Sequence, residues 1–212
     1  MSKKENKIEL KPLGNKYITV TIEGDSDLVL NKMSDPEARE LIDKRKDKAK
    51  SNEKRNYWEE IITKIHWRDG KPAEFTEESM VDCLTNNAPC LTNFGLKKSF
   101  MQAVVRNEID KYSTKFDATV NLFGQRGLTP IRFASHRIEE MLMSPKKGSP
   151  VLARLNIFSG WSADIRVSFM ETAYSAEQIV NIINLAGFGI GIGSSKPSGF
   201  GRYHVAGVRE GI

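Results

Sequence analysis

A glycine-rich segment near the C-terminus restricts the fold of this chain more than any other feature of the sequence. Six glycines fall within fifteen residues, with cationic and aromatic side chains among or beside them: Gly187, Gly189, Gly191, Gly193, Gly199 and Gly201, with Lys196, Phe200, Arg202 and Tyr203. Glycine adopts backbone angles that other residues avoid, and it lets a ligand approach the main chain closely. The segment therefore predicts a loop that is either a tight structural connection or a surface for a phosphate backbone.

Two well-known phosphate-binding loops do not fit this segment. The P-loop requires Gly-Lys followed by Ser or Thr, and the sequence contains no such triplet. The dinucleotide fingerprint requires Gly-x-Gly-x-x-Gly between a strand and a helix. Its third glycine would fall at Ile192 or Ser194, so this pattern also fails.

The residues on either side place the loop between a helix and a strand. Ser175-Ala-Glu-Gln178 has the pattern of a capping box, which opens a helix. An apolar face at helical spacing follows it: Ile179, Val180, Ile182, Ile183 and Ala186. Gly187 is placed to cap the end of that helix, and the apolar residues between Tyr203 and Val208 predict a final strand.

This order of elements resembles the glycine-rich loop of the RAMP superfamily, the RNA-binding proteins of CRISPR systems. The resemblance is carried by residues 186–205, which are also similar to the C-terminal signature of RAMP-like phage proteins. A second similar piece is residues 91–104, where a helix opens near the pair Lys97 and Lys98. The two pieces together cover about a sixth of the chain. The resemblance implies a ferredoxin-like fold, an RNA partner, self-assembly along the strand, and a phage protein in the cytoplasm of a bacterial host.

The pattern of apolar residues predicts the same fold class, α+β. Strands are expected over 17–22, 118–123, 151–157 and 165–169, and an amphipathic helix over 94–109. With the helix and strand around the glycine loop, the order contains the series strand, helix, strand, strand, helix, strand, which is ferredoxin-like. We therefore expect an antiparallel sheet with two helices on one face. Residues 1–14 are expected to form a flexible polar tail, and residues 15–212 a single domain.

Residues 26–93 are expected to form an inserted, helical and basic lobe within that domain. Ser34-Asp-Pro-Glu37 starts a helix that is expected to run to about residue 50. Residues 56–65 are expected to form a second helix or an extended arm. Residues 66–93 are expected to be irregular, because Asp69-Gly-Lys-Pro72 interrupts any regular pattern.

The positive charge of the chain is modest in amount and clustered in position. The net charge is +5, which is compatible with a nucleic-acid partner without identifying one. The basic cluster of the insertion includes Lys44, Arg45 and Lys46, which could equally form a solvated helix face. Lys97 with Lys98 and Lys196 with Arg202 form smaller groups.

The sequence gives no pattern for a membrane segment, a metal site or a cofactor. No apolar run reaches the eighteen residues of a membrane helix, and the polar N-terminus has no signal region. Cys83 and Cys90 lack a zinc spacing and are expected to be reduced thiols. His66 and His136, the latter expected at a helix start, have no nucleophile or carboxylate at a recognisable spacing.

The leading hypothesis is a non-enzymatic protein that binds single-stranded nucleic acid, with RNA favoured over DNA, and that forms a homo-oligomer. Amides of residues 187–201, with Lys196 and Arg202, would hold phosphates, while Phe200 or Tyr203 supports a base. Trp161 is a further stacking candidate that could equally be part of the core. Two alternatives stay open: a metal-independent endoribonuclease of the same fold, and a protein-interaction module that mimics a CRISPR subunit.

Overall fold

The computed structural model describes residues 14–45, 56–143 and 151–211. In chain order its elements are β1 (Asn15–Gly24), β2 (Leu28–Leu30), α1 (Asp35–Arg45), α2 (Tyr57–Thr63), β3 (His66–Trp67), α3 (Glu77–Asn86), β4 (Pro89–Thr92), α4 (Asn93–Arg106), α5 (Thr114–Thr119), β5 (Val120–Phe123), η1 (Gln125–Gly127), β6 (Leu128–Arg132), β7 (Ser135–Met143), β8 (Val151–Ser159), β9 (Ser162–Met170), α6 (Ala176–Gly189), η2 (Lys196–Ser198) and β10 (Tyr203–Glu210).

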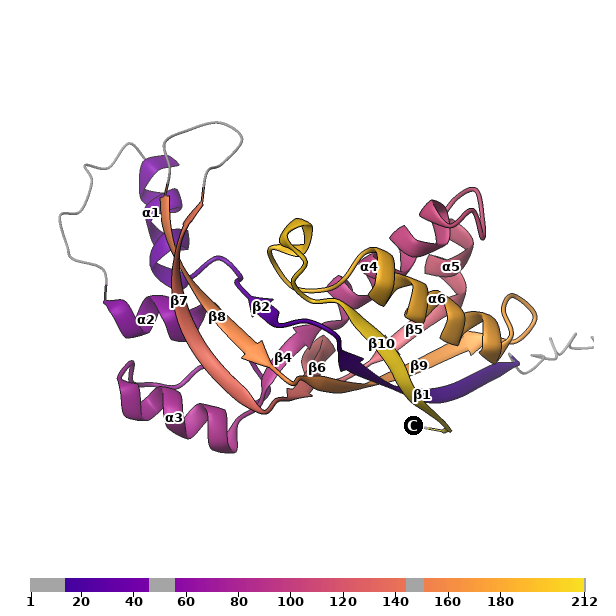
Figure 1. Ribbon diagram of the computed structural model, residues 1–212, viewed down its shortest axis with the longest axis horizontal. Coiled ribbons are helices and arrows are strands. Elements are labelled where there is room, and N and C mark those ends of the chain that lie inside the picture. Colours follow the sequence, from indigo (N-terminus) through magenta and orange to yellow (C-terminus); the bar gives the residue numbers. More distant parts are fainter. Residues whose placement is uncertain (1–13, 46–55, 144–150, 212) are drawn as a thin grey trace, which may run out of the picture.

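Four antiparallel strands in the order β10-β1-β9-β5, with α4 and α6 on one face, form the centre of the molecule (Figure 1). Along the chain these elements run β1-α4-β5-β9-α6-β10, which is the ferredoxin-like order. Successive side chains of a strand point to opposite faces of the sheet. Ile18, Val20 and Ile22 of β1 alternate with residues such as Thr21 and are all buried, so this face of the sheet packs against the two helices. The predicted α+β, ferredoxin-like fold is confirmed.

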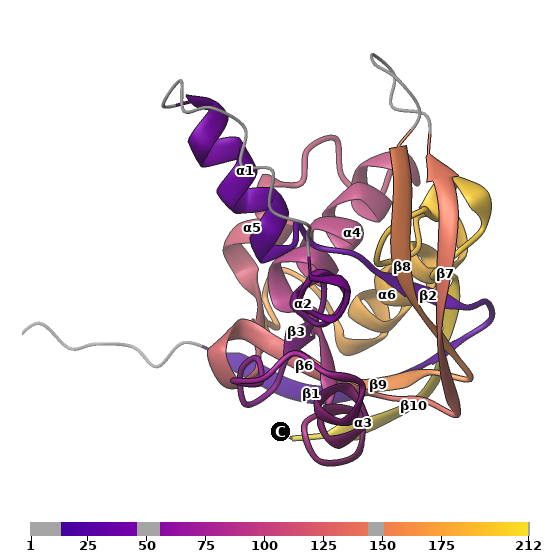
Figure 2. The same cartoon turned by 90° about the vertical axis from the view of Figure 1, so that its left-hand side faces the viewer.

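The remaining strands widen this sheet and build a second one. The strands β6, β4 and β3 continue the first sheet beyond β9, while β2, β8 and β7 form a separate three-stranded sheet (Figure 2). Figure 1 shows this second sheet with α1, α2 and α3 at the opposite end of the molecule from α5 and α6. The chain crosses from β8 to β9 at Gly160, which has a φ of +59°. A glycine is suited to this position because the left-handed region disfavours other residues.

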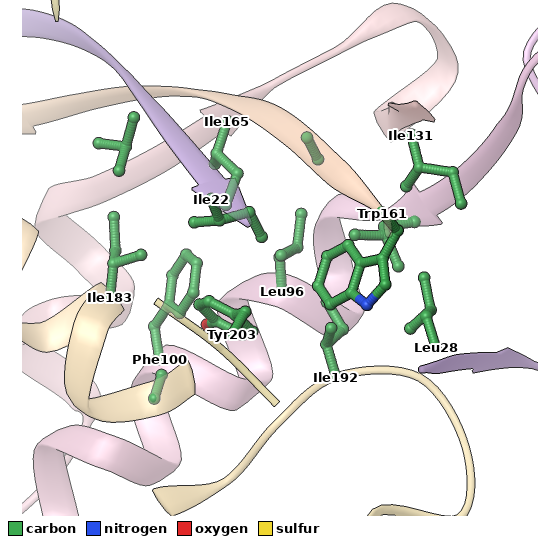
Figure 3. Packing of buried hydrophobic residues seen from close by; sticks show 14 of the residues in the cluster. Ile22, Leu28, Leu96, Phe100, Ile131, Trp161, Ile165, Ile183, Ile192 and Tyr203 are labelled. Atoms are coloured by element: carbon green, nitrogen blue, oxygen red, sulfur yellow. The ribbon is translucent and has the colours of Figure 1, made fainter. Parts of the chain in front are cut away.

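The core connects the central sheet to the glycine loop. Trp161, Tyr203, Phe100 and Leu96 meet between the sheet and α4, together with Ile192 from the loop (Figure 3). Trp161 also donates a hydrogen bond of 2.8 Å from its indole nitrogen to the Ser26 carbonyl. The large rings close to the loop are therefore part of the core, and they fix the position of the loop.

Three segments differ from the expectations. Residues 66–93 are not irregular, because Thr76 caps α3 and the strands β3 and β4 flank that helix. His136 does not start a helix but lies in β7, opposite Phe158 of β8, where the pairing of the two strands outweighs the local helix signal. Residues 118–119 end α5 instead of beginning β5. The predicted extension of α1 to residue 50 and the tail up to residue 13 lie outside the described residues.

Candidate nucleic-acid interface

The helix before the glycine loop begins as predicted and ends two residues later than predicted. The Oγ of Ser175 accepts a hydrogen bond of 3.2 Å from the Gln178 amide, and the Gln178 side chain accepts one of 2.9 Å in return. The helix continues to Gly189, so Gly187 is not its cap. A β-carbon at Gly187 would lie 2.0 Å from the Tyr203 carbonyl oxygen. This glycine therefore lets α6 pack directly on β10.

The loop itself is bonded to the segment that precedes and includes β2. The Gly201 amide donates to the Asp27 carbonyl at 2.8 Å, and the Ser194 amide donates to the Val29 carbonyl at 2.9 Å. Gly201 has a φ of +71°, and a β-carbon there would lie 1.9 Å from the Ile192 carbonyl oxygen. Several of the predicted site glycines are therefore required by the close packing of backbones.

These bonds correct the expectation that the loop amides hold phosphates. Six of the amides already donate to carbonyl groups of the protein: those of Gly191, Ile192, Ser194, Ser198, Gly199 and Gly201. An amide in such a bond is not free for a ligand. Gly189 and Gly199 are the glycines of residues 187–201 that face open space. These six amides are therefore not available to a phosphate, which makes the cationic side chains of the loop the better candidates for that contact.

The aromatic candidates also need correction. Tyr203 and Trp161 are each 1% exposed, so neither ring can stack on a base. Phe200 is half-buried and packs against the small cluster formed by Leu155 and its neighbours on β8. Phe188, which was not predicted, is 84% exposed in the last turn of α6. The sequence signal for an exposed ring at this site is the position of Phe188 between Gly187 and Gly189, because a large apolar residue there has little to pack against.

Four cationic side chains form what we call the cationic cluster: Lys196 and Arg202 of the loop segment, with Lys98 and Arg106 of α4. Partial burial lowers the pKa of Lys196, and the charges of the other three members lower it further. In the described part of the chain, no carboxylate forms an ion pair with any of the four. The Arg202 guanidinium instead donates a 2.9 Å hydrogen bond to the Phe188 carbonyl. The cluster therefore combines predicted residues with Arg106, which the sequence patterns did not single out.

The other predicted cations do not join this cluster. The ammonium of Lys97 lies 2.8 Å from a carboxylate oxygen of Asp117 and 2.7 Å from the Asp117 carbonyl. Its charge is therefore already compensated within the protein. Lys44 and Arg45 form the end of α1, but their side chains lie outside the described residues, as does Lys46. The contribution of the insertion to the interface stays a prediction.

A groove of about 190 Å³ lies beside the loop and is lined by residues of β2, β3, β4 and the start of α4. Lys32, His66 and Ser194 are among its lining residues. Burial, and then the charge of Lys32, lowers the pKa of His66. Cys90 also lines the groove, but burial raises the pKa of its thiol to about 12, so the thiol is protonated at neutral pH. The groove presents neutral imidazole and ammonium groups to a ligand.

No described helix is both long enough and apolar enough to cross a bilayer. No group of three or more His, Cys, Asp or Glu side chains in that part of the chain is arranged to hold a metal ion.

The comparisons with known proteins identify the fold. One similar chain is in the cryo-EM structure of the Type III-B Cmr-beta bound to cognate target RNA, with a TM-score of 0.54 at 10% identity over 93% of this chain. This chain spans 61% of the length of that one. Another is in the crystal structure of Cmr6 from Pyrococcus furiosus, with a TM-score of 0.45 at 11% identity, covering 92% of this chain and 99% of that chain. No protein-family model and no curated protein sequence matches. The chain therefore shares its fold with the Cmr-beta chain, in line with the ferredoxin-like fold that the resemblance of the glycine loop implies.

Proposed function

We propose that this RAMP-fold chain binds single-stranded RNA through the cationic cluster and the exposed ring of Phe188. The observation that carries the proposal is the crowding of four cations without carboxylate partners around the glycine loop. Elsewhere most described cations are paired, as Arg137 is with Asp27 at 2.8 Å. Like charges gathered in one place repel one another, and a phosphate backbone relieves that repulsion.

The loop sets the geometry of this surface. Ser99 of α4 donates a 2.9 Å hydrogen bond to the Gly191 carbonyl, which holds the loop against the helix that carries Lys98 and Arg106. Arg202 is bonded to the carbonyl of Phe188. Cations and an exposed aromatic ring beside one loop support the proposal, because single-strand binding proteins combine these two kinds of group.

The preference for RNA over DNA rests on the fold. The similar Cmr-beta structure is described as bound to cognate target RNA. RNA-binding proteins recognise single strands mostly by stacking the unpaired bases on aromatic side chains. We therefore propose RNA as the ligand, a non-enzymatic role, and assembly of several copies along the strand, with Lys44, Arg45 and Lys46 contacting a neighbouring copy or the outgoing strand.

The test is a fluorescence anisotropy titration with labelled single-stranded RNA, single-stranded DNA and blunt duplex at several salt concentrations. If the four cations of the cluster each neutralise one phosphate, the log–log salt slope for single strands is expected to be about −3. Tighter binding of single-stranded RNA than of the other two ligands supports the proposal. A flat salt response, or equal affinity for duplex, contradicts it.

One observation favours a second candidate, a metal-independent endoribonuclease. His66 lies in the groove beside the loop, and burial keeps its imidazole neutral at pH 7, as a general base requires. A time course with end-labelled RNA, with and without EDTA, tests this role. Cleavage that survives EDTA and is lost in His66→Ala would favour the enzyme, whereas intact RNA favours the binding protein. Purified protein that carries no nucleic acid and binds none would instead favour a protein-interaction module.

A further inference from the structure

The face of the central sheet opposite α4 and α6, which we call the open face, is not covered by any helix in the described part of the chain (Figure 1). Residues of β1 from Tyr17 to Glu23 with odd numbers project onto this face. They do so because Ile18, Val20 and Ile22 alternate with them and project into the core. Because no described helix covers the open face, it can act as a second binding surface.

Two aromatic rings lie together on the open face. The rings of Tyr17 on β1 and Phe123 on β5 have their centroids 6.1 Å apart, at an interplanar angle of 42°. Their residues are 44% and 40% exposed, respectively. The two rings bridge across β9, where Arg166 is directly opposite Phe123 in the register. Two large rings exposed side by side have apolar surface to offer to a ligand.

Two arginines, Arg132 and Arg166, lie beside Phe123 of this pair of rings. Arg166 is exposed and makes no ion pair with any described carboxylate. The carboxylate of Asp164 lies on the same face and is already bonded by Arg132 at 3.0 Å and by the Thr21 hydroxyl at 2.7 Å. A hollow of about 320 Å³ runs beside Phe123 and includes Arg132, Asp164 and Arg166 in its lining. The charge of Asp164 is therefore compensated by Arg132, whereas Arg166, next to the rings, has no described carboxylate partner.

We propose that the open face binds a second stretch of single-stranded nucleic acid, with a base stacked on Tyr17 and Phe123 and a phosphate held by Arg166. Bases stack on aromatic rings without sequence preference, and an arginine beside them supplies the phosphate contact. Two isolated rings among arginines do not form the continuous apolar centre that a stable protein interface requires. This inference rests on the proposed function, and it adds a binding surface on the layer opposite the cationic cluster.

The experiment compares three double variants of the full chain by anisotropy with labelled polyuridine. The first, Tyr17→Ala with Phe123→Ala, removes the two rings. The second, Lys196→Ala with Arg202→Ala, weakens the cationic cluster. The control, Tyr112→Ala with Lys111→Ala, removes an exposed ring and the cation 5.3 Å from its centroid, in the segment between α4 and α5. Loss of one stacked base is expected to weaken binding by about 5- to 150-fold in the first variant.

The outcomes separate the two proposals. Weakening by the first variant but not by the control supports the open face as a binding surface. If the parent binds and the Lys196/Arg202 variant weakens, while the Tyr17/Phe123 variant binds like the parent, the open face is not a contact and the proposed function stands. If the parent does not bind any single strand, both are wrong. Photo-crosslinking of 4-thiouridine RNA to the parent, with mapping of the crosslinked peptides, gives a second readout that needs no variant, and absence of crosslinks at β1 and β5 overturns the inference.

Discussion

Replacing Lys196 and Arg202 together with alanine tests the cationic cluster directly. Each side chain is expected to make one charge-assisted contact with a phosphate, of about 1.5–3 kcal/mol. Lys98 and Arg106 remain in the variant and take over part of the lost attraction. The expected loss of binding free energy is therefore about 2–4 kcal/mol, which corresponds to about 30- to 900-fold in the dissociation constant. Removal of two phosphate contacts is also expected to reduce the salt slope by about 1.4.

The fold of this variant is expected to survive. Lys196 is bordered by other cations and Arg202 makes one hydrogen bond to a carbonyl, so neither carries core packing. Anisotropy titrations with single-stranded RNA at four or more salt concentrations measure both quantities. Lys16→Ala with Lys111→Ala is the matched control, since it removes two exposed positive charges elsewhere, one of them in a surface ion pair. An Lys196/Arg202 variant with parental affinity and parental salt slope would show that the cluster does not hold phosphates.

Three further predictions concern stability and are measured by denaturant unfolding. Gly187→Ala is expected to lower the free energy of unfolding by about 2 kcal/mol or more, because its β-carbon would meet the Tyr203 carbonyl. Gly189 faces open space in the last turn of α6, so Gly189→Ala is expected to raise the free energy of unfolding by about 0.5–1 kcal/mol. Equal effects of the two substitutions would refute the backbone contact at Gly187. Tyr203→Phe is expected to stabilise by about 1 kcal/mol, because the buried hydroxyl makes no hydrogen bond to any described residue, and a loss of stability would reveal a partner. Burial lowers the pKa of His136, and the hydrogen bond that its Nε2 donates to Asn156 Oδ1 offsets this only in part. The unfolded chain therefore binds the proton more tightly, so stability is expected to fall as the pH drops below about 6.5. His136→Gln should flatten that slope.

The sequence predicted the central layers because their signals are local. The alternation in β1 and β9 and the capping box of Ser175 need no knowledge of distant residues, and each was confirmed. The second sheet could not be found in the same way. His136 follows a serine and precedes an arginine, a pattern typical of a helix start, and its strand conformation comes from pairing with β8. Pairing between strands is a long-range property, which a local pattern does not contain.

The candidate site was only partly predicted, because some of its residues come together through long-range packing. Lys196 and Arg202 lie in the loop and were found from the sequence, but Arg106 joins them only because α4 passes beside the loop. The sequence predicts Tyr203 as a stacking ring because it is an aromatic residue at the end of a strand, yet that strand turns its ring into the core. The rings of Tyr17 and Phe123 are more than a hundred residues apart in the chain, and they meet only after β1 and β5 pair with opposite edges of β9.

The glycine pattern therefore indicates mainly where backbones pack closely. For this reason a test of function should substitute the cations of the loop and not its glycines. Where a loop amide already donates to a carbonyl, as that of Gly201 does to Asp27, replacing the glycine disturbs β2 and the core together. A loss of binding in such a variant would not distinguish a lost phosphate contact from a displaced loop. The charges of Lys196 and Arg202 can be removed without moving the backbone, because their side chains lie on the surface of a loop that is fixed by other residues. The cations of the cluster are for this reason the positions at which binding and folding can be measured separately.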